Sequence, residues 1–158
     1  MSVLQVGDLA PDFEAPVAGG DYQTGQKLKL SDLLGEVVVL YFYPKDDTPG
    51  CTTQACDIRD HYDAVSKRCK IFGISVDSIA KHEKFLAKYA LPFPLWSDED
   101  QQIVEKYDVW VEKSMYGKKY FGVERSTFVV GRDGKLAAII RKVKPAEHVK
   151  WLEENLPE

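Results

Sequence analysis

The chain has 158 residues, which is room for one ordinary domain, and we expect residues 1–158 to form a single domain. Apolar residues make up 44% and charged residues 29% of the sequence, a globular composition that excludes wholesale disorder. The formal net charge is −4. We therefore expect no nucleic-acid partner and no membrane partner, because nucleic acids and anionic membranes both require a basic surface.

The sequence also lacks the patterns of membrane and secreted proteins. No apolar run approaches the roughly 20 residues of a membrane span. The first residues do not resemble a secretory signal, and three cysteines are too few for a disulfide scaffold. We expect a cytoplasmic protein in a reducing compartment, where a cysteine is a small apolar residue, a metal ligand or a reactive group.

The first part of the chain predicts irregular structure and then a buried strand. Residues 1–30 are glycine-rich and irregular, apart from an alternating stretch at 26–30 that predicts a strand. Ser31 is placed to cap a short helix that ends at Gly35. Residues 37–43 are all β-branched, aliphatic or aromatic, which is typical of a strand buried on both faces.

A helix is predicted after the loop at 45–50. Thr48 is a suitable N-cap, and Pro49 is a favoured first helical residue. Cys51 and Cys69 lie four residues beyond either end of an apolar series and extend it toward the core. That series defines one buried helix face and consists of Ala55, Ile58, Tyr62 and Val65.

A second buried strand is predicted at 71–76, and Ser78 is placed to cap the helix that follows it. Residues 91–95 contain two prolines and end that helix. A shorter helix is expected at 100–107. The apolar positions of the helix after Ser78 are Ile79, Leu86 and Tyr89.

Two β-rich runs at 127–130 and 136–140 flank the turn at 132–135 and predict a hairpin. Pro145 opens a final helix. The order of elements predicts an α/β protein of thioredoxin-like fold, in which a central mixed sheet carries helices on both faces. The apolar face of the final helix consists of Val149, Leu152 and Leu156.

Cys51 occupies a chemically favourable position, directly after a buried strand and a Pro/Thr/Gly loop. The first turn of a helix presents unpaired N–H groups and about half a positive charge. Both features stabilise a thiolate more than a thiol, and the thiolate is the nucleophile. A buried, inert cysteine is the alternative, and the helix-start position alone does not decide between the two.

The residues before Cys51 resemble the signature of the peroxiredoxin family. That signature is a proline, three residues, a threonine, two residues and the peroxidatic cysteine, and here it reads Pro44-Lys45-Asp46-Asp47-Thr48-Pro49-Gly50-Cys51. A second cysteine five residues later resembles the subgroup called bacterioferritin comigratory protein or peroxiredoxin Q. Further segments also resemble the family, namely residues 41–44, 51–56, 73–77, 96–98 and 122–128.

The resemblance implies a thiol-dependent peroxidase. Cys51 would attack the peroxide as a thiolate and become a sulfenic acid. The Thr48 hydroxyl would donate to the peroxide and accept from a neighbouring group, which positions the O–O bond. Arg125 would hold the thiolate and stabilise the developing charge, together with the N–H groups of Gly50 and Cys51. Pro44 would shape the pocket wall and shield the sulfenate. No metal or organic cofactor is expected, because sulfur carries the redox change.

The resemblance also implies that Cys56 is the resolving cysteine, whose thiol condenses with the sulfenate to an intramolecular disulfide. In a continuous helix, the Cα atoms of Cys51 and Cys56 would be about 8.6 Å apart. A disulfide spans roughly 7 Å at most. We therefore expect residues 49–58 to unwind on oxidation. The alternative for Cys56 is a bystander on the side of the helix.

Two residues near the signature allow more than one interpretation. Cys69 stands between basic neighbours, which favours reactivity, but it also extends the apolar face, and we expect an inert structural cysteine. A second resolving thiol is the alternative. The family that the chain resembles commonly has a glutamate at the position of Gln54, so Gln54 departs from its pattern. An amide can still hydrogen-bond Arg125, although it does not offset the charge of that residue.

The remaining polar residues are expected to lie on the surface. A basic and aromatic stretch at 113–120 indicates a solvated loop or hairpin, with a docking surface for an acidic reductase as the alternative. Histidines are expected on solvated helix faces rather than as metal ligands. The three histidines are His61, His82 and His148. The basic and aromatic residues of the stretch are Lys113, Tyr116, Lys118, Lys119 and Tyr120.

Other functions explain the cysteines less well. A thioredoxin-type oxidoreductase requires Cys-x-x-Cys, whereas this chain has Cys-x₄-Cys. A cysteine phosphatase requires an arginine soon after its nucleophile, but the corresponding residue is Asp57, which repels phosphate. A redox sensor or holdase, in which Cys51 and Cys56 oxidise only to change a binding surface, stays open, and turnover with a reductant distinguishes it.

The resemblance further implies the partners. The substrate would be hydrogen peroxide or an organic hydroperoxide, and the reductant would be thioredoxin or a similar dithiol protein. A resolving cysteine within the chain needs no partner subunit, so we expect a monomer. Phe42, Tyr43 and Trp96 are candidates for an apolar lining of the substrate pocket.

Overall fold

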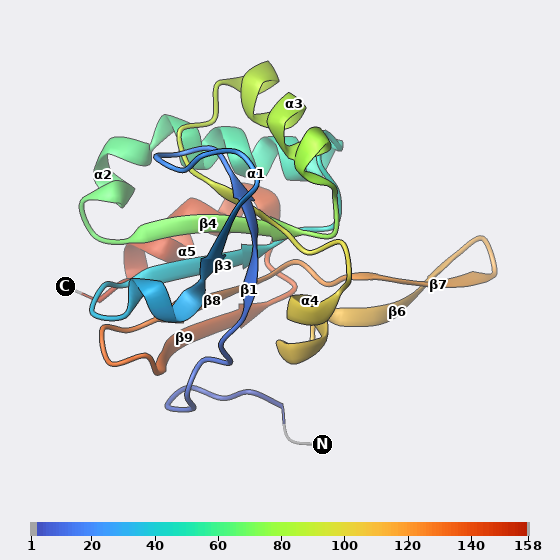
Figure 1. The fold of residues 1–158 in the computed structure, drawn as a ribbon. Coiled ribbons are helices and arrows are strands. Elements are labelled where there is room, and N and C mark those ends of the chain that lie inside the picture. Colours follow the sequence, from blue (N-terminus) through green and yellow to red (C-terminus); the bar gives the residue numbers. More distant parts are fainter. Residues whose placement is uncertain (1–2, 158) are drawn as a thin grey trace.

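A seven-stranded mixed sheet forms the centre of the molecule in the computed structural model, which describes residues 3–157 (Figure 1). Its strands are β1 (Glu14–Ala18), β2 (Gln26–Lys29), β3 (Val38–Phe42), β4 (Lys70–Ser75), β5 (Leu95–Ser97), β8 (Ser126–Val130) and β9 (Leu136–Arg141). They lie in the order β2-β1-β5-β4-β3-β8-β9. The pairs β3–β4 and β4–β5 are parallel, and the other pairs are antiparallel.

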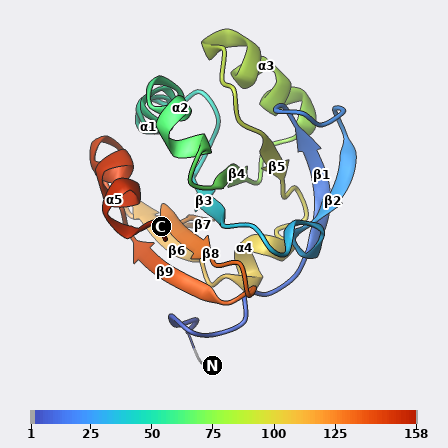
Figure 2. The same ribbon diagram turned by 90° about the vertical axis from the view of Figure 1, so that its left-hand side faces the viewer.

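Helices cover both faces of the sheet. They are the 3₁₀ turns η1 (Leu30–Leu33) and η2 (Pro145–Glu147) and the helices α1 (Pro49–Asp60), α2 (Tyr62–Ser66), α3 (Ile79–Tyr89), α4 (Gln102–Lys106) and α5 (His148–Asn155). The helices α1, α2, α3 and α5 pack on one face, whereas α4 and η1 pack on the other (Figure 2). The predicted α/β architecture is confirmed. No helix among residues 3–157 is long and apolar enough to cross a membrane.

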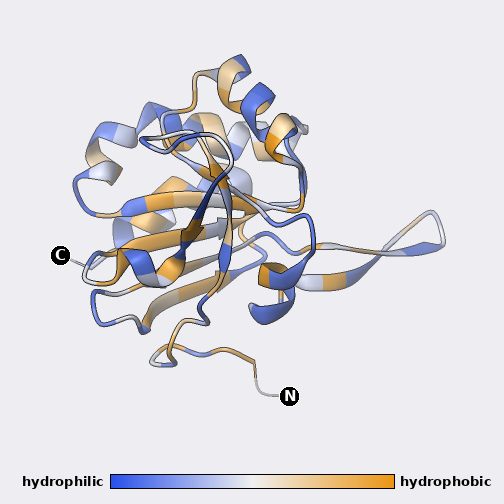
Figure 3. Cartoon of the chain, viewed as in Figure 1, coloured by the Kyte–Doolittle hydropathy of each residue, from blue (hydrophilic) through white to orange (hydrophobic). Residues whose placement is uncertain are grey.

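Strand β3 contributes to the cores on both faces, and all of its residues are buried. Successive side chains of a strand point to opposite faces. Leu40 and Phe42 therefore join the core under α4, whereas Tyr41 and Tyr43 join the core under α1, which also contains Cys51. Figure 3 shows hydrophobic residues concentrated on the central strands and many hydrophilic residues on the helices.

Two strands were not predicted. Residues 14–18 lie in the stretch expected to be irregular, but they form β1 and pair with both β2 and β5. Residues 95–97 follow the proline-rich break and form β5. Each strand is short, and β1 contains Pro16, so neither has a local pattern that distinguishes it from a loop. Pairing with distant strands decides their conformation.

The helix after Thr48 is interrupted. Helix α1 ends at Asp60, and α2 begins at Tyr62, on the other side of His61, whose φ is −110° and ψ is 11°. The apolar series crosses this break, and Cys51 and Cys69 are both buried as predicted. Spacing predicted the buried face correctly because the break does not change which side of the chain faces the sheet.

Of the two serine caps predicted, one is present and one is not. The Ser78 hydroxyl accepts the Lys81 N–H at 3.3 Å, which confirms the predicted cap of α3. The fully buried residues of α3, however, are His82 and Phe85, so its inner face is rotated from the predicted one. The predicted Ser31 cap is wrong, because η1 begins one residue earlier, at Leu30.

The remaining predicted elements are present. Helix α4 lies within 100–107, and β8 and β9 form the predicted hairpin. Helix α5 follows η2 and buries its predicted apolar face. A further hairpin, β6 (Trp110–Met115) and β7 (Lys118–Val123), forms a separate two-stranded sheet that projects from the body of the molecule (Figure 1). It contains the basic and aromatic stretch, which is therefore a hairpin rather than an open loop.

Candidate active site

Cys51 lies in the first turn of α1, and its side chain is 2% exposed. The helix begins where predicted, because Thr48 is extended at φ −98° and Pro49 supplies the first helical residue. The first hydrogen bond of the helix joins the Thr52 N–H to the Thr48 carbonyl at 2.8 Å. The N–H groups of Gly50 and Cys51 therefore precede the helical ladder, beside the sulfur.

The Thr48 hydroxyl does not cap the helix. It donates a hydrogen bond of 2.9 Å to the carbonyl oxygen of Lys45, across the turn that precedes the helix. The hydroxyl hydrogen is thereby committed, so in this state the oxygen of Thr48 offers lone pairs and can accept a hydrogen bond from a ligand. We expected a donor to the peroxide here, and the geometry instead presents an acceptor.

Arg125 supplies the positive charge beside Cys51. It follows β7 in the sequence, and its Nη2 donates to the Cys51 sulfur at 3.4 Å. Gly50 leaves room for this approach, because a Cβ atom at that position would lie 3.1 Å from Arg125 Nη2 and would require the guanidinium to shift. The structure thus brings together two predicted site residues that are separated by 74 positions in the chain.

Gln54 holds the other side of the guanidinium. Its side-chain oxygen accepts from Arg125 Nη1 at 2.6 Å, and Gln54 itself is fully buried. Gln54 also contacts His148 on α5. His148 is fully buried, so its predicted solvated position is wrong, because α5 packs this face against α1 and the sheet. Nothing in the local pattern of α5 distinguishes His148 from an exposed histidine.

The loop before Cys51 is hydrogen-bonded to α3. The Asp47 carboxylate accepts from Lys88 Nζ and from the Tyr89 hydroxyl, both at 2.8 Å. Asp46 is buried beside His82, which is also fully buried. The predicted solvated position of His82 is therefore wrong. Of the three histidines, only His61 is exposed.

Cys56 is half-buried on the same helix as Cys51, and helix α1 is continuous between them. Both thiols are free. The structure is therefore that of the reduced form, and the helix itself separates the two sulfurs. This is the arrangement from which the predicted unwinding would start.

Cys69 lies in the turn before β4 and is 8% exposed. Its thiol lies 3.5 Å from the carbonyl oxygen of Val65. Burial raises the pKa of Cys69 to about 12, although the charge of Arg68 opposes this shift. At neutral pH the residue is a thiol, which agrees with the inert structural role expected for it.

The three aromatic residues expected to line the substrate pocket do not lie together. Tyr43 packs in the core that contains Cys51. Phe42 and Trp96 are fully buried in the core on the opposite face of the sheet. Pro44, by contrast, is half-buried at the end of β3, where the chain turns toward Cys51. Strand alternation separates Phe42 from Tyr43, so the expectation is wrong for Phe42 and Trp96.

One lysine of the β6–β7 hairpin is hydrogen-bonded to the last residue of β7. Lys113 Nζ donates to the Val123 carbonyl at 2.6 Å. Burial and the nearby Arg125 lower the pKa of Lys113. The hairpin also exposes large apolar side chains, namely Met115, Tyr116, Tyr120 and Phe121.

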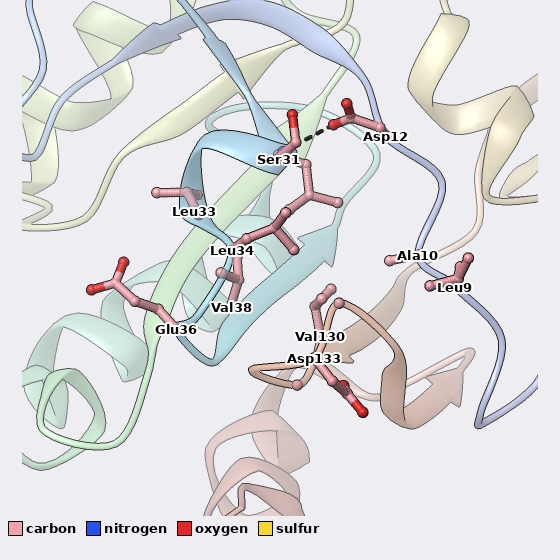
Figure 4. Close-up of a pocket in the computed structure, with 13 residues that line it drawn as sticks. Leu9, Ala10, Asp12, Ser31, Leu33, Leu34, Glu36, Val38, Val130 and Asp133 are labelled. Carbon is pink, nitrogen blue, oxygen red and sulfur yellow. Dashed lines mark hydrogen bonds between the residues drawn. The ribbon is translucent and has the colours of Figure 1, made fainter.

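A separate apolar pocket of about 290 Å³ lies at the other end of β3 (Figure 4). Leu33, Leu34, Val38 and Val130 point into it. The carboxylate of Asp12 at its edge already accepts the backbone N–H of Ser31 at 2.9 Å. No cysteine, lysine or arginine is among its described lining residues. This pocket is therefore distinct from the site around Cys51.

Comparison with known proteins relates the whole arrangement to one family. Residues 6–139 match the AhpC/TSA family. Peroxiredoxin Bcp of Bacillus subtilis is 47% identical over 147 residues, which cover 92% of this chain and 90% of that protein. Peroxiredoxin Bcp of Escherichia coli is 41% identical over 160 residues, which cover 98% of this chain and 99% of the relative.

Solved structures agree with these relatives. Peroxiredoxin Q of Xanthomonas campestris superposes with a TM-score of 0.82 at 38% identity and covers 96% of this chain and 93% of its own. A cysteine variant of Xylella fastidiosa PrxQ superposes with a TM-score of 0.87 at 31% identity, over 98% and 96% of the two chains. The predicted thioredoxin-like fold is confirmed by these superpositions.

Proposed function

The chain belongs to the AhpC/TSA family and is a thiol peroxidase of the peroxiredoxin kind, and from this premise we propose that Cys51 is its peroxidatic cysteine and Cys56 its resolving cysteine. The contact of 3.4 Å between Arg125 Nη2 and the Cys51 sulfur is the observation that carries the proposal. The N–H groups of a helix start and a permanent cation both stabilise negative charge on a sulfur placed beside them.

The first step is nucleophilic attack. The Cys51 thiolate attacks the distal oxygen of the hydroperoxide and forms an S–O bond while the O–O bond breaks. The electron pair leaves with the proximal oxygen, which takes a proton from solvent and departs as water or an alcohol, while the distal oxygen keeps its hydrogen and becomes the sulfenic hydroxyl. Sulfur is oxidised to a sulfenic acid, and the peroxide is reduced.

The neighbouring groups would stabilise this step. The guanidinium of Arg125 contacts the sulfur, and together with the free N–H groups of Gly50 and Cys51 at the helix start it would stabilise negative charge as it moves onto the leaving oxygen. The Thr48 hydroxyl, which donates its hydrogen bond to the Lys45 carbonyl, accepts a hydrogen bond from the peroxide O–H and so orients the O–O bond. Pro44, half-buried at the end of β3, would form the wall of the pocket and limit access of water to the sulfenate.

The second step converts the Cys51 sulfenic acid into a disulfide. The Cys56 thiol attacks the Cys51 sulfenic acid, an S–S bond forms, and water leaves with the sulfenic oxygen and a proton. Because α1 is continuous between the two residues, residues 49–58 unwind before the sulfurs meet. A dithiol reductant then reduces the disulfide by exchange, and thioredoxin or a similar protein fits this requirement.

The substrates and the setting follow from the same chemistry. The solved Xanthomonas campestris relative is described with alkyl peroxide reduction activity, which supports organic hydroperoxides beside hydrogen peroxide as substrates here. A resolving cysteine in the same chain supports a monomer that folds as one peroxiredoxin domain over residues 1–158. A reducing cytoplasm supplies the dithiol that the cycle consumes.

Peptide mapping after one equivalent of hydrogen peroxide tests this proposal. The wild-type protein should lose two hydrogens and yield a linked Cys51–Cys56 peptide, whereas Cys56→Ser should trap a sulfenic acid on Cys51. Cys51→Ser should stay reduced, and Cys69→Ser is the matched control that should behave as the wild type. A wild-type protein that stays reduced would overturn the peroxidatic role of Cys51. A linked Cys51–Cys69 peptide would overturn the role of Cys56 alone.

A further inference from the structure

His148 is connected to the Cys51 sulfur by a chain of hydrogen-bonded side chains. Its Nε2 lies 2.7 Å from the Thr127 hydroxyl on β8, and its Nδ1 lies 3.1 Å from Nε2 of Gln54 on α1. Gln54 then contacts Arg125, which contacts Cys51. All members of this chain except Arg125 are buried. The relay therefore joins α5 and β8 to the proposed nucleophile through the interior.

The chemistry of arginine fixes the direction of every bond in this relay. A guanidinium has donors only, so the Gln54 atom that faces Arg125 is the amide oxygen. The amide nitrogen of Gln54 consequently faces His148 and donates to Nδ1. Nδ1 is then an acceptor, so the ring proton lies on Nε2 and is donated to the Thr127 hydroxyl.

Any other arrangement of the relay opposes like groups. If the Gln54 amide were turned over, its NH₂ group would face the guanidinium, donor against donor. If His148 were protonated on Nδ1, that proton would face the NH₂ group of Gln54. Burial, together with the charge of Arg125, lowers the pKa of His148 to about 3, which keeps the ring neutral and Nδ1 free to accept. A single assignment of donors and acceptors therefore fits the contacts that link Thr127, His148, Gln54 and Arg125.

We propose that His148 is a positioning residue for peroxide reduction, whose Nδ1 lone pair holds the Gln54 amide in the orientation that presents its oxygen to Arg125. Arg125 is thereby kept against Cys51, and its Nη2 stays free for the sulfur and the peroxide. The neutral amide at position 54 makes this control necessary, because either end of an amide fits the same space, whereas a carboxylate offers oxygen at both ends. The inference rests on the proposed peroxidatic role of Cys51.

Two substitutions of His148 separate positioning from packing. His148→Phe keeps a planar ring in the core but removes the acceptor, and the second-order rate of Cys51 oxidation by hydrogen peroxide should fall roughly 10- to 100-fold. His148→Asn carries an amide oxygen near the position of Nδ1 and should restore most of that loss. The rate at which iodoacetamide alkylates Cys51, measured across pH, should rank the proteins in the same order: wild type fastest, His148→Asn next and His148→Phe slowest. Val149→Ala trims a buried side chain of the same helix and should leave the rate within about twofold.

A double-mutant cycle identifies the path of the effect. If His148 acts through Gln54, the loss caused by His148→Phe should disappear in a Gln54→Met background. The inference is overturned if folded His148→Phe reacts like the wild type, or if its loss is unchanged in that background. Should His148→Phe not fold, Thr127→Val repeats the cycle one hydrogen bond further out, with a smaller loss that Gln54→Met also abolishes. A wild-type Cys51 that does not react with peroxide would instead contradict the proposed function.

Discussion

The Asp46 carboxylate lies 2.6 Å from Nδ1 of His82, in the interior between the loop that precedes Cys51 and helix α3. Nε2 of His82 lies 2.9 Å from the Trp96 carbonyl, so both ring nitrogens face oxygen atoms. The Tyr43 hydroxyl donates to the other carboxylate oxygen at 2.5 Å. The loop that carries the peroxiredoxin signature therefore rests on a buried, fully paired ionisable couple.

Removal of His82 should show how far the loop before Cys51 depends on its pairing with Asp46. His82→Leu leaves the Asp46 carboxylate buried without its main partner, and we expect the free energy of unfolding to fall by about 3–5 kcal/mol. The rate of Cys51 oxidation should fall as well, because the loop loses its anchor. Urea unfolding followed by circular dichroism measures the first effect. Glu83→Ala, at the neighbouring exposed position, should change stability by less than about 0.5 kcal/mol. A cost below about 1 kcal/mol for His82→Leu would show that the loop does not need the pair.

The guanidinium of Arg125 should matter through both its charge and its shape. Arg125→Met removes the donor that contacts Cys51, and the rate of peroxide reduction should fall roughly 10²- to 10³-fold. Arg125→Lys keeps the charge but cannot bridge Gln54 and Cys51 as a planar fork does, so its rate should be intermediate. Stopped-flow measurement of Cys51 oxidation compares the variants. Arg132→Met, in the exposed turn between β8 and β9, is the control for loss of a positive charge. If Arg125→Met reacted as fast as this control, the electrostatic role would be wrong.

The signature around Cys51 was predictable because one short segment contains it. A buried strand, a loop, Thr48 and Pro49 together specify a helix start, and the position of Cys51 follows from local rules alone. The contacts that tune the site were not predictable in this way. His82 and His148 lie on helices whose local patterns favour exposed histidines, and their burial depends on partners far away in the sequence.

The separation of Phe42 from Tyr43 shows a signal that was present but not used. Adjacent residues of a strand face opposite sides of a sheet, and α1 covers only one side. Only one of the two rings can therefore approach Cys51. By contrast, the pairing of β1 with β5 has no comparable local signal, because a strand as short as β5 is defined by its neighbours.

Oxidation should loosen the beginning of α1. In the reduced protein, the amides of residues 53–58 lie in a continuous helix and should exchange slowly with deuterated water. After one equivalent of hydrogen peroxide they should exchange at least about tenfold faster, because a Cys51–Cys56 disulfide does not fit a helix. Cys56→Ser treated in the same way should keep its protection. If the disulfide formed with protection unchanged, the unwinding would be refuted.

Cys69 should be chemically silent at neutral pH. Its raised pKa keeps it protonated, so iodoacetamide should modify Cys51 and Cys56 well before Cys69 in the folded protein. Because the folded state holds this proton more tightly than the unfolded state, stability should decrease between about pH 9 and pH 12, by at most about 1.4 kcal/mol per pH unit. Cys69→Ala should lack this decrease and keep the wild-type peroxidase rate. Alkylation of Cys69 as fast as Cys56 would contradict its buried position.

His148 should make the protein sensitive to acid. Its pKa is about 3 when folded and 6.5 in its ordinary state, so between these values the unfolded chain binds more protons at this position. The free energy of unfolding should therefore decrease as the pH falls through this window, by at most about 1.4 kcal/mol per pH unit. His148→Asn removes that contribution, and urea unfolding across the window should give it the shallower pH dependence.

His61 provides the matched control for this measurement. Its pKa is raised, first by a hydrogen bond to the backbone of Asp57, so its contribution to stability is present at low pH and is lost as the pH rises. His61→Asn should therefore leave the slope below pH 6.5 unchanged and alter the pH dependence only above it, whereas His148→Asn should flatten the slope below pH 6.5. Other titrating groups, such as Asp98 with its pKa raised to about 6 by burial, are common to all three proteins and cancel in the comparison. Equal slopes for the wild type and His148→Asn would mean that His148 accepts a proton in the folded state, and the relay to Arg125 would then lack its fixed direction.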